Sequence, residues 1–566
     1  MSDKTEVHAG VSRREFLKGT VLATAASTGV FALSGCDAPS AQASAKETYL
    51  PEAWDQETDI LVVGCGGAGI AAGITAKTEE LGEVLLLEAA PQGYEGGNTR
   101  VSAQVIFIPD NVEGAIRYQR NLNGPHVVEE ELIRSWAENI CENLDWFKQI
   151  GVEANESTFF SPEWPDVEGS EHCKTYLVGE GMGKAQLWDA LAEVANDLGV
   201  TIRHDTRVIE LVYEPQTREV LGVKATTPSG EQHIKARKGV VLACGGFEND
   251  PEMIRNYYQI GYHDTRPLGT PYNKGDGIRM AQSVGAELWH MNNFANSGFG
   301  AQAGGLDNVC VSTLSLRNKD YIYVASDGRR FMYEETVGLA RHGKYLYNGA
   351  STNLRQPIPI YAVFGSKTFD GDCIVQESFA AWLSIMKELL GTTNQAYLDA
   401  GVIVKGDTPE DLANKIGVNS NTLKETIESY NANAAAGQDP VFGRGTDVYS
   451  AFNYGAMEEA GKQGQSTIDS APENKPSIAA FALEPLVAPY YAIQLHIQTL
   501  NTQGGPRRGL EGEVLDTKGK PIPRLYAAGE LGSIYSYNYN GGGNVSEALS
   551  SGRLAARSIG KLESWE

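Results

Sequence analysis

The stretch that decides the fold is Asp59–Glu88, DILVVGCGGAGIAAGITAKTEELGEVLLLE. Its apolar start predicts a buried parallel strand, which ends in glycines at the G-x-G-x-x-G spacing, namely Gly64, Gly66 and Gly69. The first glycine permits a tight turn, the second lets the backbone approach a pyrophosphate, and the third lets a helix pack closely on the strand. Glu88 follows the next apolar run, where a carboxylate accepts hydrogen bonds from a ribose diol. The stretch therefore predicts a doubly wound α/β fold that binds a dinucleotide, and it disfavours a glycine turn without a ligand.

The composition is that of a globular protein with two or three domains, because 566 residues carry 42% hydrophobic and 21% charged side chains. The 47 basic and 72 acidic residues give a net charge of −25. This charge argues against a nucleic-acid partner; it weakly favours a basic partner protein, or serves only solubility. The seven cysteines form no C-x-x-C pair, so we expect no metal site and no c-type haem on this chain.

The amino-terminal residues 1–36 have the pattern of an export signal. Ser12–Lys18, SRREFLK, resembles the twin-arginine signal and precedes an apolar core too short to span a membrane. The alternative, a basic amphipathic helix, is disfavoured. LSGC, which ends at Cys36, resembles a lipobox, which predicts a lipid on Cys36 and a linker over 37–56. Cleavage at the A-x-A sequences within 41–45, with release of the protein, stays open as the second interpretation.

This export pattern predicts the location and the electron source. The twin-arginine translocase carries folded proteins, often with their cofactor bound. We therefore expect the protein on the outer face of the cytoplasmic membrane, lipid-anchored at Cys36, or in the periplasm or cell envelope. Because NAD(P)H is essentially absent there, a redox enzyme would take electrons from a quinol-oxidising membrane protein or a c-type cytochrome.

Further elements follow from hydrophobic periodicity and glycine positions. We expect one surface helix within 127–150 and one within 409–431, a helix after Gly277, and a last helix over 546–559. Strands are expected at 201–204, 207–213, 221–226, 231–236, 239–247 and 525–530. The motif GGNTRVS, 96–102, predicts a second glycine turn that approaches a ligand closely.

The order of these motifs resembles the fumarate reductase and succinate dehydrogenase flavoproteins, a family that includes urocanate reductases and 3-ketosteroid dehydrogenases. The resemblance covers about residues 57–560 through GCGGAG, GGNTRVS, ACGGF, GDG, GRRF with Glu334, NTQGG, LYAAGE and GGGN. It implies a Rossmann-type FAD-binding domain, 57–300 and 488–566, with an inserted α+β capping domain, 301–487. The substrate is then held between the cap and the flavin.

The resemblance also implies the FAD contacts. They fall on Gly64, Gly66, Gly69, Glu88, Asn98, Thr99, Ser102, Gly245, Gly246, Asp276, Glu530, Asn544 and Ser546. Succinate dehydrogenases attach FAD through a histidine near the second glycine turn, and this turn has none. We therefore expect non-covalent FAD.

The departures from the family pattern concern the substrate. Fumarate reductases hold one carboxylate with a histidine and an arginine at the positions of Asn501 and Asn540. Two amides in place of two charged anchors make a dicarboxylate unfavourable and a neutral or singly charged substrate favourable.

The proton donor of the family also has no direct counterpart, because its arginine falls on Gly338. Arg341 lies nearly one helical turn further on and could reach the same space; an ordinary surface arginine is an equally good interpretation. Tyr333, Tyr345 and Tyr347 are alternative donors.

Tyr539 and Gly543 match the spacing of the tyrosine and glycine with which 3-ketosteroid dehydrogenases hold a ketone oxygen. A phenol and a backbone N–H would polarise a carbonyl as charge develops on it. The alternative is that this tyrosine-rich run serves only packing.

Three hypotheses follow. The first is an exported FAD enzyme that reduces a C=C bond conjugated to a carbonyl, with Arg341 or a cap tyrosine protonating the α-carbon. The second is a 3-ketosteroid-type dehydrogenase that runs this chemistry in reverse. The third is a flavin-loaded electron-transfer or binding lipoprotein without turnover.

Overall fold

The structure is a computed structural model that describes residues 49–158, 160–179, 186–258, 265–301, 312–314, 316, 320–332, 334, 344–347, 350–353, 359–376, 391–444 and 483–566. Residues 49–566 form one compact unit. The twin-arginine motif, Cys36, Tyr333 and Arg341 lie outside the described residues. In the part that is described, no helix is both long and apolar enough to cross a membrane.

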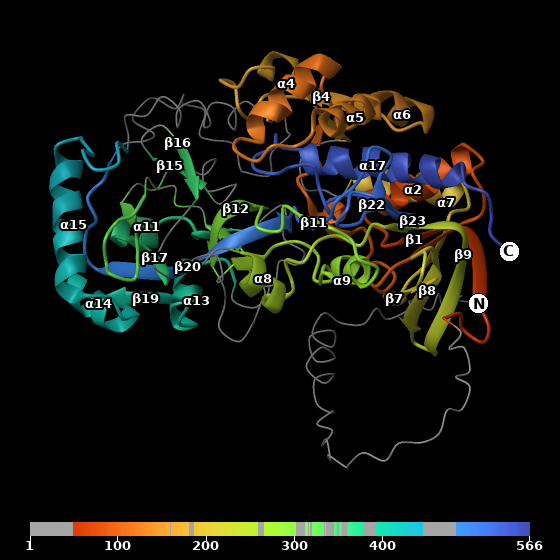
Figure 1. Ribbon diagram of the computed structural model, residues 1–566. Helices are drawn as coiled ribbons and strands as arrows, with labels where there is room; N and C mark the ends of the chain where they lie inside the picture. The colour runs from red at the N-terminus through yellow and green to blue at the C-terminus, as the bar shows by residue number, and fades with distance from the viewer. Residues whose placement is uncertain are drawn as a thin grey trace, which may run out of the picture. The chain divides into compact units, whose positions relative to one another are not determined.

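A mostly parallel sheet carries the glycine motif (Figure 1). Its order is β22-β23-β9-β1-β2-β6, in which β1, β2, β6, β9 and β23 pair in parallel and β22 is antiparallel. The antiparallel β7 and β8 extend this sheet from β9. The bounds are β1 Gln56–Val63, β2 Val84–Leu87, β6 Thr201–Arg203, β7 Arg207–Tyr213, β8 Val220–Thr227, β9 Gly230–Leu242, β22 Glu513–Leu515 and β23 Pro521–Ala527. The parallel pairing of β23 with β9 joins the carboxyl-terminal part of the chain to the sheet that the amino-terminal part begins.

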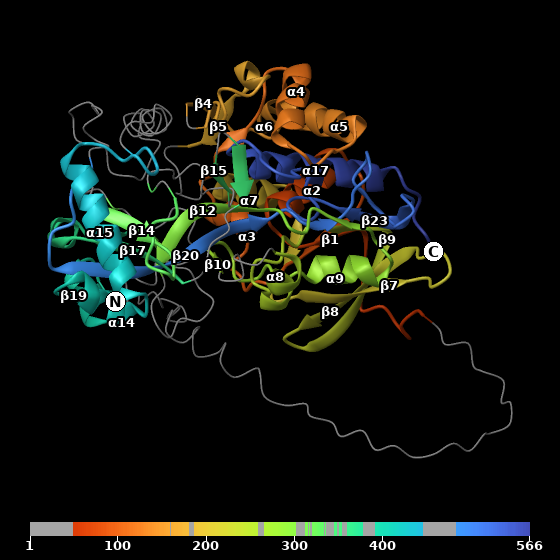
Figure 2. The same ribbon diagram turned by 60° about the vertical axis from the view of Figure 1, so that its left-hand side comes forward.

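Two helices lie side by side over this sheet, α2 (Gly67–Thr78) and α17 (Gly543–Gly560) (Figures 1 and 2). Glycine allows their close approach, because a Cβ on Gly552 would lie 2.1 Å from the Ala68 carbonyl oxygen. Further helices are α3 Gly97–Val101, α7 Gln186–Asp197, α8 Pro251–Tyr257 and α9 Asp276–Ser283. The mixed α/β class expected from the sequence is confirmed.

A helical layer covers α17 on the side away from the sheet (Figure 1). It comprises α4 Val112–Leu122, α5 Glu130–Cys141 and α6 Asn143–Gln149, next to a small sheet of β3 Ile106–Phe107, β4 Ala154–Ser157 and β5 Thr175–Val178. A short 3-10 helix, η1, spans Ser170–His172. The buried Arg553 of α17 fastens this layer, because it donates to Asn143 Oδ1 at 2.8 Å and to the Asn139 carbonyl oxygen at 2.8 Å.

A second sheet has the order β14-β17-β20-β12-β13-β18, with β10 and β19 also paired to β20. Its strands are β10 Thr265–Pro267, β12 Phe294–Ala301, β13 Ser312–Leu314, β14 Tyr321–Val324, β17 Ile360–Phe364, β18 Val375–Gln376, β19 Ile403–Gly406 and β20 Tyr490–Thr502. The other elements are β11 Leu288–Trp289, β15 Lys344–Tyr347, β16 Ala350–Asn353, β21 Gly505–Pro506, α11 Ser366–Asp370, α13 Asn394–Asp399, α14 Pro409–Ile416 and α15 Ser420–Ala435. The predicted cap boundary at 300 falls within β12, and the one at 487 lies just before β20, with which β12 pairs; both boundaries stay predictions.

A buried group of four charges stabilises the second sheet. Arg330 donates to Glu334 at 2.6 and 2.7 Å and to Asp439 at 2.8 and 3.1 Å. Arg444 lies 3.6 Å from Glu334, and all four side chains are at most 7% exposed. Because two cations face two anions, the group buries no uncompensated charge.

Two predicted helices and two predicted strands differ in extent from the structure. The helix expected within 127–150 is two helices, α5 and α6. The helix expected within 409–431 is also two, because Gly417 has a left-handed φ of 76° that ends α14 before Asn419 caps α15. The strands expected at 231–236 and 239–247 are one continuous strand, β9.

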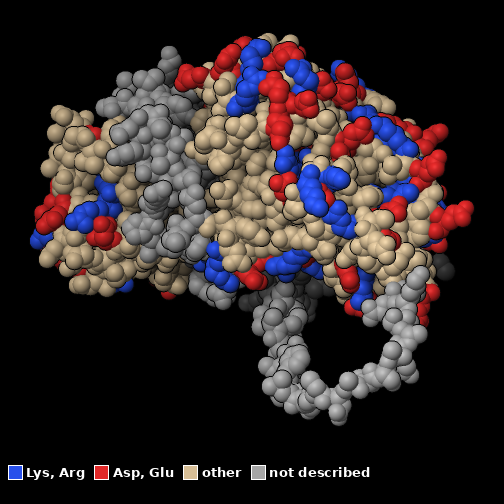
Figure 3. Space-filling model, viewed as in Figure 1, with Lys and Arg blue, Asp and Glu red and all other residues tan. Residues whose placement is uncertain are grey.

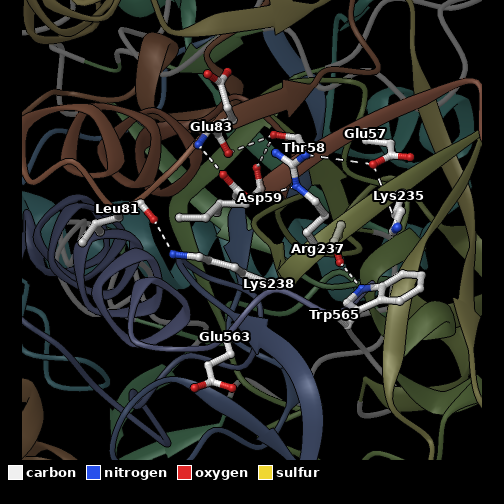
Figure 4. Close-up of polar contacts among 12 residues, drawn as sticks. Glu57, Thr58, Asp59, Leu81, Glu83, Lys235, Arg237, Lys238, Glu563 and Trp565 are labelled. Carbon is white, nitrogen blue, oxygen red and sulfur yellow. Dashed lines mark hydrogen bonds and ion pairs between the residues drawn. The ribbon is translucent and has the colours of Figure 1, made fainter.

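Charged pairs close the amino-terminal end of the first sheet (Figure 4). Asp59 of β1 accepts from Arg237 Nε of β9 at 2.9 Å and from the Glu83 N–H at 2.9 Å. Burial acts to raise the pKa of Asp59, but these two hydrogen bonds and the guanidinium charge outweigh it and lower that pKa. Trp565 donates its indole N–H to a β9 carbonyl oxygen at 2.7 Å, which fixes the chain's last residues to the same edge.

The surface charge is mixed on the face that Figure 3 shows, where acidic and basic side chains are interspersed and a broad area carries neither. This face has no extended basic field, which fits the acidic excess of the sequence.

Candidate functional site

The three glycines of the first motif have separate structural roles. Gly64 has a φ of 103°, and a Cβ there would lie 2.5 Å from the Ala243 carbonyl oxygen. A Cβ on Gly69 would lie 2.0 Å from the Gly64 carbonyl oxygen, so glycine is needed where α2 packs on the end of β1. Gly66 meets nothing closer than 3.7 Å and therefore leaves its side of the loop open.

Glu88 lies directly after β2 and faces this loop. Its carboxylate accepts from the Cys65 N–H and from the Ala90 N–H, each at 2.7 Å. Burial raises the pKa of Glu88, and the two backbone N–H groups act against that rise. The predicted acid and the predicted glycine loop are thus in direct contact.

The second glycine turn lies against the first. Gly66 and Gly96 form a parallel bridge, and Thr99 Oγ1 accepts from the Gly67 N–H at 3.2 Å. Ser102 Oγ donates to the Thr99 carbonyl oxygen at 2.9 Å, which closes the end of α3. The structure therefore brings Thr99 and Ser102 to the start of α2.

Asn98, on the same turn, reaches a group of acids at the carboxyl ends of β9 and β23. Its Nδ2 donates to Glu248 Oε1 at 2.8 Å and lies 3.3 Å from both Glu530 carboxylate oxygens. Gly246 donates its N–H to Glu530 Oε1 at 2.7 Å. Gly245 has a φ of 71°, and a Cβ there would lie 2.3 Å from Asn273 Oδ1. Asn98, Gly245, Gly246 and Glu530, which the family resemblance implies as FAD contacts, thus lie together.

The remaining predicted FAD contacts lie on α9 and α17. Asp276 begins α9 and pairs with Arg207 of β7 at 2.5 Å. Ser546 is fully buried, and its hydroxyl donates to the Phe107 carbonyl oxygen. Asn544, in the first turn of α17, has a buried Oδ1 without a hydrogen-bond partner in the described structure.

Asn501 lies next to Asn544. Its Oδ1 accepts from Asn544 Nδ2 at 3.1 Å, and its Nδ2 donates to the Thr502 carbonyl oxygen at 3.0 Å. Asn501 is only 5% exposed, so this amide holds the end of β20 against the start of α17.

Asn540 uses its hydrogen-bonding capacity within the protein. Its Oδ1 accepts from the Tyr118 hydroxyl at 2.8 Å and from the Glu163 N–H at 3.0 Å. Its Nδ2 donates to the Phe160 and Gly541 carbonyl oxygens at 2.8 and 2.9 Å. This arrangement gives Asn540 a supporting role, and its direct contact with substrate stays a prediction.

Tyr539 and Gly543 are neighbours, as their spacing predicts. A Cβ on Gly543 would lie 3.1 Å from the Tyr539 ring and 2.8 Å from the Tyr535 hydroxyl, and the two rings stack with centroids 5.0 Å apart. However, the Gly543 N–H donates to the Asn540 carbonyl oxygen at 2.9 Å. The Gly543 N–H must release or share this bond to polarise a substrate.

Arg341 and Tyr333 cannot be placed, because both lie outside the described residues, and so do the side chains of Tyr345 and Tyr347. Glu334, next to Tyr333, is held by Arg330, as described above. Over the ranges that the structure describes, no group of three or more His, Cys, Asp or Glu side chains gathers as a metal site does.

Comparison with known proteins decides the family. The family model described as "FAD binding domain" matches residues 59–546. The chain belongs to this FAD-binding family. A probable fumarate reductase of Shewanella frigidimarina is 25% identical over 92% of this chain and 80% of the relative. A digoxin reductase of Eggerthella lenta is 24% identical over 99% of both chains, and a 3-oxosteroid 1-dehydrogenase of Mycobacterium tuberculosis is 26% identical over 89% of this chain and 98% of the relative.

Solved structures show the same fold. The 3-ketosteroid Δ1-dehydrogenase of Sterolibacterium denitrificans has a TM-score of 0.67 at 20% identity, covering 89% of this chain and 99% of that one. An open flavocytochrome c3 fumarate reductase has a TM-score of 0.60 at 22% identity, covering 99% and 83%. The protein is thus an FAD-dependent oxidoreductase of the class that acts on CH–CH groups, in the fumarate reductase and succinate dehydrogenase flavoprotein family.

The site of this flavoprotein fits FAD. The N-termini of α2 and α17 have glycine N-caps, Gly66 and Gly542, which carry no capping side chain. The first N–H of each helix is bound within the protein, at Gly67 to Thr99 and at Gly543 to Asn540, and the next N–H groups suit a pyrophosphate and a flavin oxygen. Of the residues that the family resemblance implies as FAD contacts, those at the two glycine turns and at the ends of β9, β23 and α17 are partly exposed, namely Gly64, Gly66, Asn98, Ser102, Gly245, Glu530 and Asn544. Gly69, Glu88, Thr99, Gly246 and Ser546 are buried behind them.

Two residues of this site escaped the sequence reasoning. Glu248 is 3% exposed and Asn273 is 6% exposed, and Asn273 Nδ2 donates to both Glu248 and Glu530. The sequence features that could have identified them are an acid directly after Gly245-Gly246-Phe247 and an amide shortly before Gly275.

Proposed function

We propose that this flavoprotein is an exported enzyme that reduces a C=C bond conjugated to a carbonyl, in an enone or an acrylate-type substrate. The observation that carries the proposal is the amide character of Asn501 and Asn540, whose hydrogen bonds described above are directed to the protein. A dicarboxylate would find no cation at either position, whereas a neutral carbonyl needs only a hydrogen-bond donor.

The basic side chains that contact residues 532 and 533 also support this interpretation, because they carry little free positive charge. Arg508, which contacts the Gly532 carbonyl oxygen, is neutralised by Glu547. His290 donates its Nδ1–H to the Ser533 carbonyl oxygen at 2.8 Å, and burial lowers the pKa of His290 to about 4, so the ring is neutral at pH 7. The positive charge next to residues 532–540 is therefore neutralised at Arg508 and absent at His290, which favours a neutral carbonyl over a dicarboxylate.

The residues have the following proposed roles. FAD, once reduced by the electron donor, would supply the two electrons that reduce the alkene. Tyr539 would donate its hydroxyl to the carbonyl oxygen and so stabilise the negative charge that forms there, assisted by Gly543 if its N–H is released. Arg341 or Tyr333 would protonate the α-carbon. The Asn501 and Asn540 amides would orient these groups.

The reverse reaction is the second candidate, because relatives named 3-oxosteroid 1-dehydrogenase align over 89% of this chain. The same Tyr539 would then polarise the ketone during desaturation. An electron-transfer or binding lipoprotein without turnover is the third.

The decisive experiment is anaerobic. Reduced holoprotein is mixed with a steroid enone, with cinnamate or urocanate, and with fumarate, and flavin reoxidation is followed by absorbance. Reoxidation by the enone or the acrylate and not by fumarate supports the proposal; rapid fumarate turnover contradicts the role of the two amides. Failure with every alkene, together with reduction of oxidised flavin by a saturated ketone, favours the dehydrogenase, and failure in both directions favours the carrier.

A matched pair of variants tests the carbonyl donor. Tyr539→Phe should slow enone-dependent reoxidation roughly 10²-fold, the order found for loss of one oxyanion donor, without changing the flavin spectrum. Tyr537→Phe, two residues away and partly exposed, is the control. Equal rates for both variants would remove Tyr539 from the mechanism.

We further propose that FAD is non-covalent, that the twin-arginine translocase exports the chain, that Cys36 carries lipid, and that a membrane quinol-oxidising protein or c-type cytochrome supplies electrons. Acid precipitation should release the flavin into the supernatant. Cys36→Ala should move the protein from the membrane to the soluble fraction, and an unchanged membrane fraction would contradict lipid anchoring.

A further inference from the structure

Two acids share the same hydrogen-bond donors inside the FAD site. Asn273 Nδ2 lies 2.8 Å from Glu248 Oε1 and 2.9 Å from Glu530 Oε1. Asn98 Nδ2 also reaches both carboxyl groups, at 2.8 and 3.3 Å. A Cβ placed on Gly246 would lie 2.8 Å from Glu248 Oε2 and 3.1 Å from Glu530 Oε1. The two carboxyl groups therefore face one another across a very small space.

No cation compensates this pair within the described residues, where neither acid has a Lys, Arg or His within 4.0 Å. The titratable groups that face it are the phenol of Tyr258 and the carboxyl of Glu547. Glu547 is already paired with Arg508. Two ionised carboxylates would here repel each other in a poorly solvated site, and loss of one charge relieves this repulsion.

The hydrogen bonds point the same way. Glu248 is 3% exposed, and its Oε2 has no hydrogen-bond partner in the described structure. An ionised oxygen left in this state is costly, whereas a protonated carboxyl carries no charge there. Burial raises the pKa of Glu248 to about 7, and burial together with the Glu248 charge raises the pKa of Glu530.

We propose that Glu248 and Glu530 form a carboxylic acid dyad that retains one proton beside the FAD, and that FAD binding takes up this proton from alkaline solution. Glu530 is partly exposed at the lining of the site, whereas Glu248 lies behind it. FAD would cover Glu530 and remove it from water, which favours the protonated dyad. Glu248 is thus a positioning residue that acts through Glu530. The inference depends on FAD binding and is independent of the substrate.

Proton uptake by the dyad makes FAD binding weaker at high pH. FAD binding raises the apparent pKa of the dyad, so the dyad is protonated before and after binding at low pH, and no proton is exchanged. Above the apparent pKa of the free dyad, binding must bring in a proton. The association constant for FAD therefore falls with pH in that range, by at most about tenfold per pH unit for one proton.

Calorimetry of the full-length protein tests this directly. FAD is titrated into the deflavinated chain at pH 6 and pH 8, in two buffers with different ionisation enthalpies, which yields the number of protons taken up. We expect a value near zero at pH 6 and a clearly larger value, approaching one, at pH 8. Wild-type protein that takes up no proton at pH 8 overturns the proposal, whatever the variants do.

Substitutions of the two acids test whether these carboxyl groups hold the proton. Glu248→Gln keeps the shape and the hydrogen-bonding atoms, and it should abolish the uptake at pH 8; Glu530→Gln should do the same. The control is Glu113→Gln, which replaces an exposed acid of α4 that pairs with Arg134 of α5; this variant should keep the wild-type proton uptake. Circular dichroism confirms folding. If folded Glu248→Gln protein takes up as many protons as wild type, the proton does not depend on Glu248, and the dyad is contradicted.

Discussion

Two alanine substitutions in the first glycine motif separate cofactor binding from folding. At Gly69, a methyl group would lie 2.0 Å from the Gly64 carbonyl oxygen, about 1 Å closer than a Cβ can approach, so α2 must move away from β1. At Gly66, the nearest atom is 3.7 Å away and the φ of −87° suits any residue. The methyl of Gly66→Ala is therefore tolerated by the protein and occupies the open side of the loop.

The expected magnitudes differ accordingly. Overpacking of this kind costs about 1–3 kcal/mol, which for a unit of this size lowers the Tm of Gly69→Ala by roughly 1–3 °C. Gly66→Ala should leave the unfolding free energy of the FAD-free protein within ~0.5 kcal/mol. It should nevertheless weaken FAD binding at least about tenfold, or ~1.4 kcal/mol, because the pyrophosphate can no longer approach the α2 N-terminus.

Thermal unfolding of the FAD-free variants and FAD titration by flavin fluorescence measure the two effects. Each variant is the control for the other. Wild-type FAD affinity in Gly66→Ala would refute the placement of the pyrophosphate at this loop. A larger loss of Tm in Gly66→Ala than in Gly69→Ala would refute the steric argument.

Two further substitutions test the packing of charges. Glu334→Gln should lower the unfolding free energy measured in urea by about 3 kcal/mol, because Arg330 stays buried without its main partner. The control is Glu410→Gln, in the exposed pair with Lys424, which should not change the unfolding free energy measurably. The pKa of Asp59 is lowered in the folded state, so its carboxylate should stabilise the protein above pH ~4 and lose that contribution as the pH falls further. Asp59→Asn should therefore be less stable than wild type at pH 7. In urea titrations, this variant should lose less unfolding free energy between pH 7 and pH 3 than wild type does.

The glycine cradle was predictable because its determinants are local. Gly64, Gly66, Gly69 and Glu88 lie within one strand–helix–strand unit, and each has a steric or hydrogen-bonding reason that a short sequence displays. The helix breaks were missed because apolar spacing continues through them. At Gly417, only the left-handed backbone and the following cap by Asn419 show that α14 ends.

The catalytic region was harder because its contacts join distant segments. Asn540 is held by Tyr118 and Glu163, more than 370 residues away in sequence, and Glu248 meets Glu530 across 282 residues. Family position suggested that Asn540 faces the substrate, but position alone cannot show that its four hydrogen bonds are already used. Such pairings depend on the tertiary fold, which a motif does not encode.

The glycines after β9 show how one motif serves two purposes. The family resemblance implies that Gly246 contacts FAD, and a Cβ there would also lie 2.0 Å from Thr502 Oγ1 and within 3.1 Å of both acids. Gly246→Ala would thus push Glu530 and Glu248 apart without removing either carboxyl group. If the acids share one proton because they are crowded, this variant should lose part of the proton uptake at pH 8 that Glu248→Gln loses entirely. Unchanged uptake would mean that burial alone, and not the repulsion between the two acids, retains the proton.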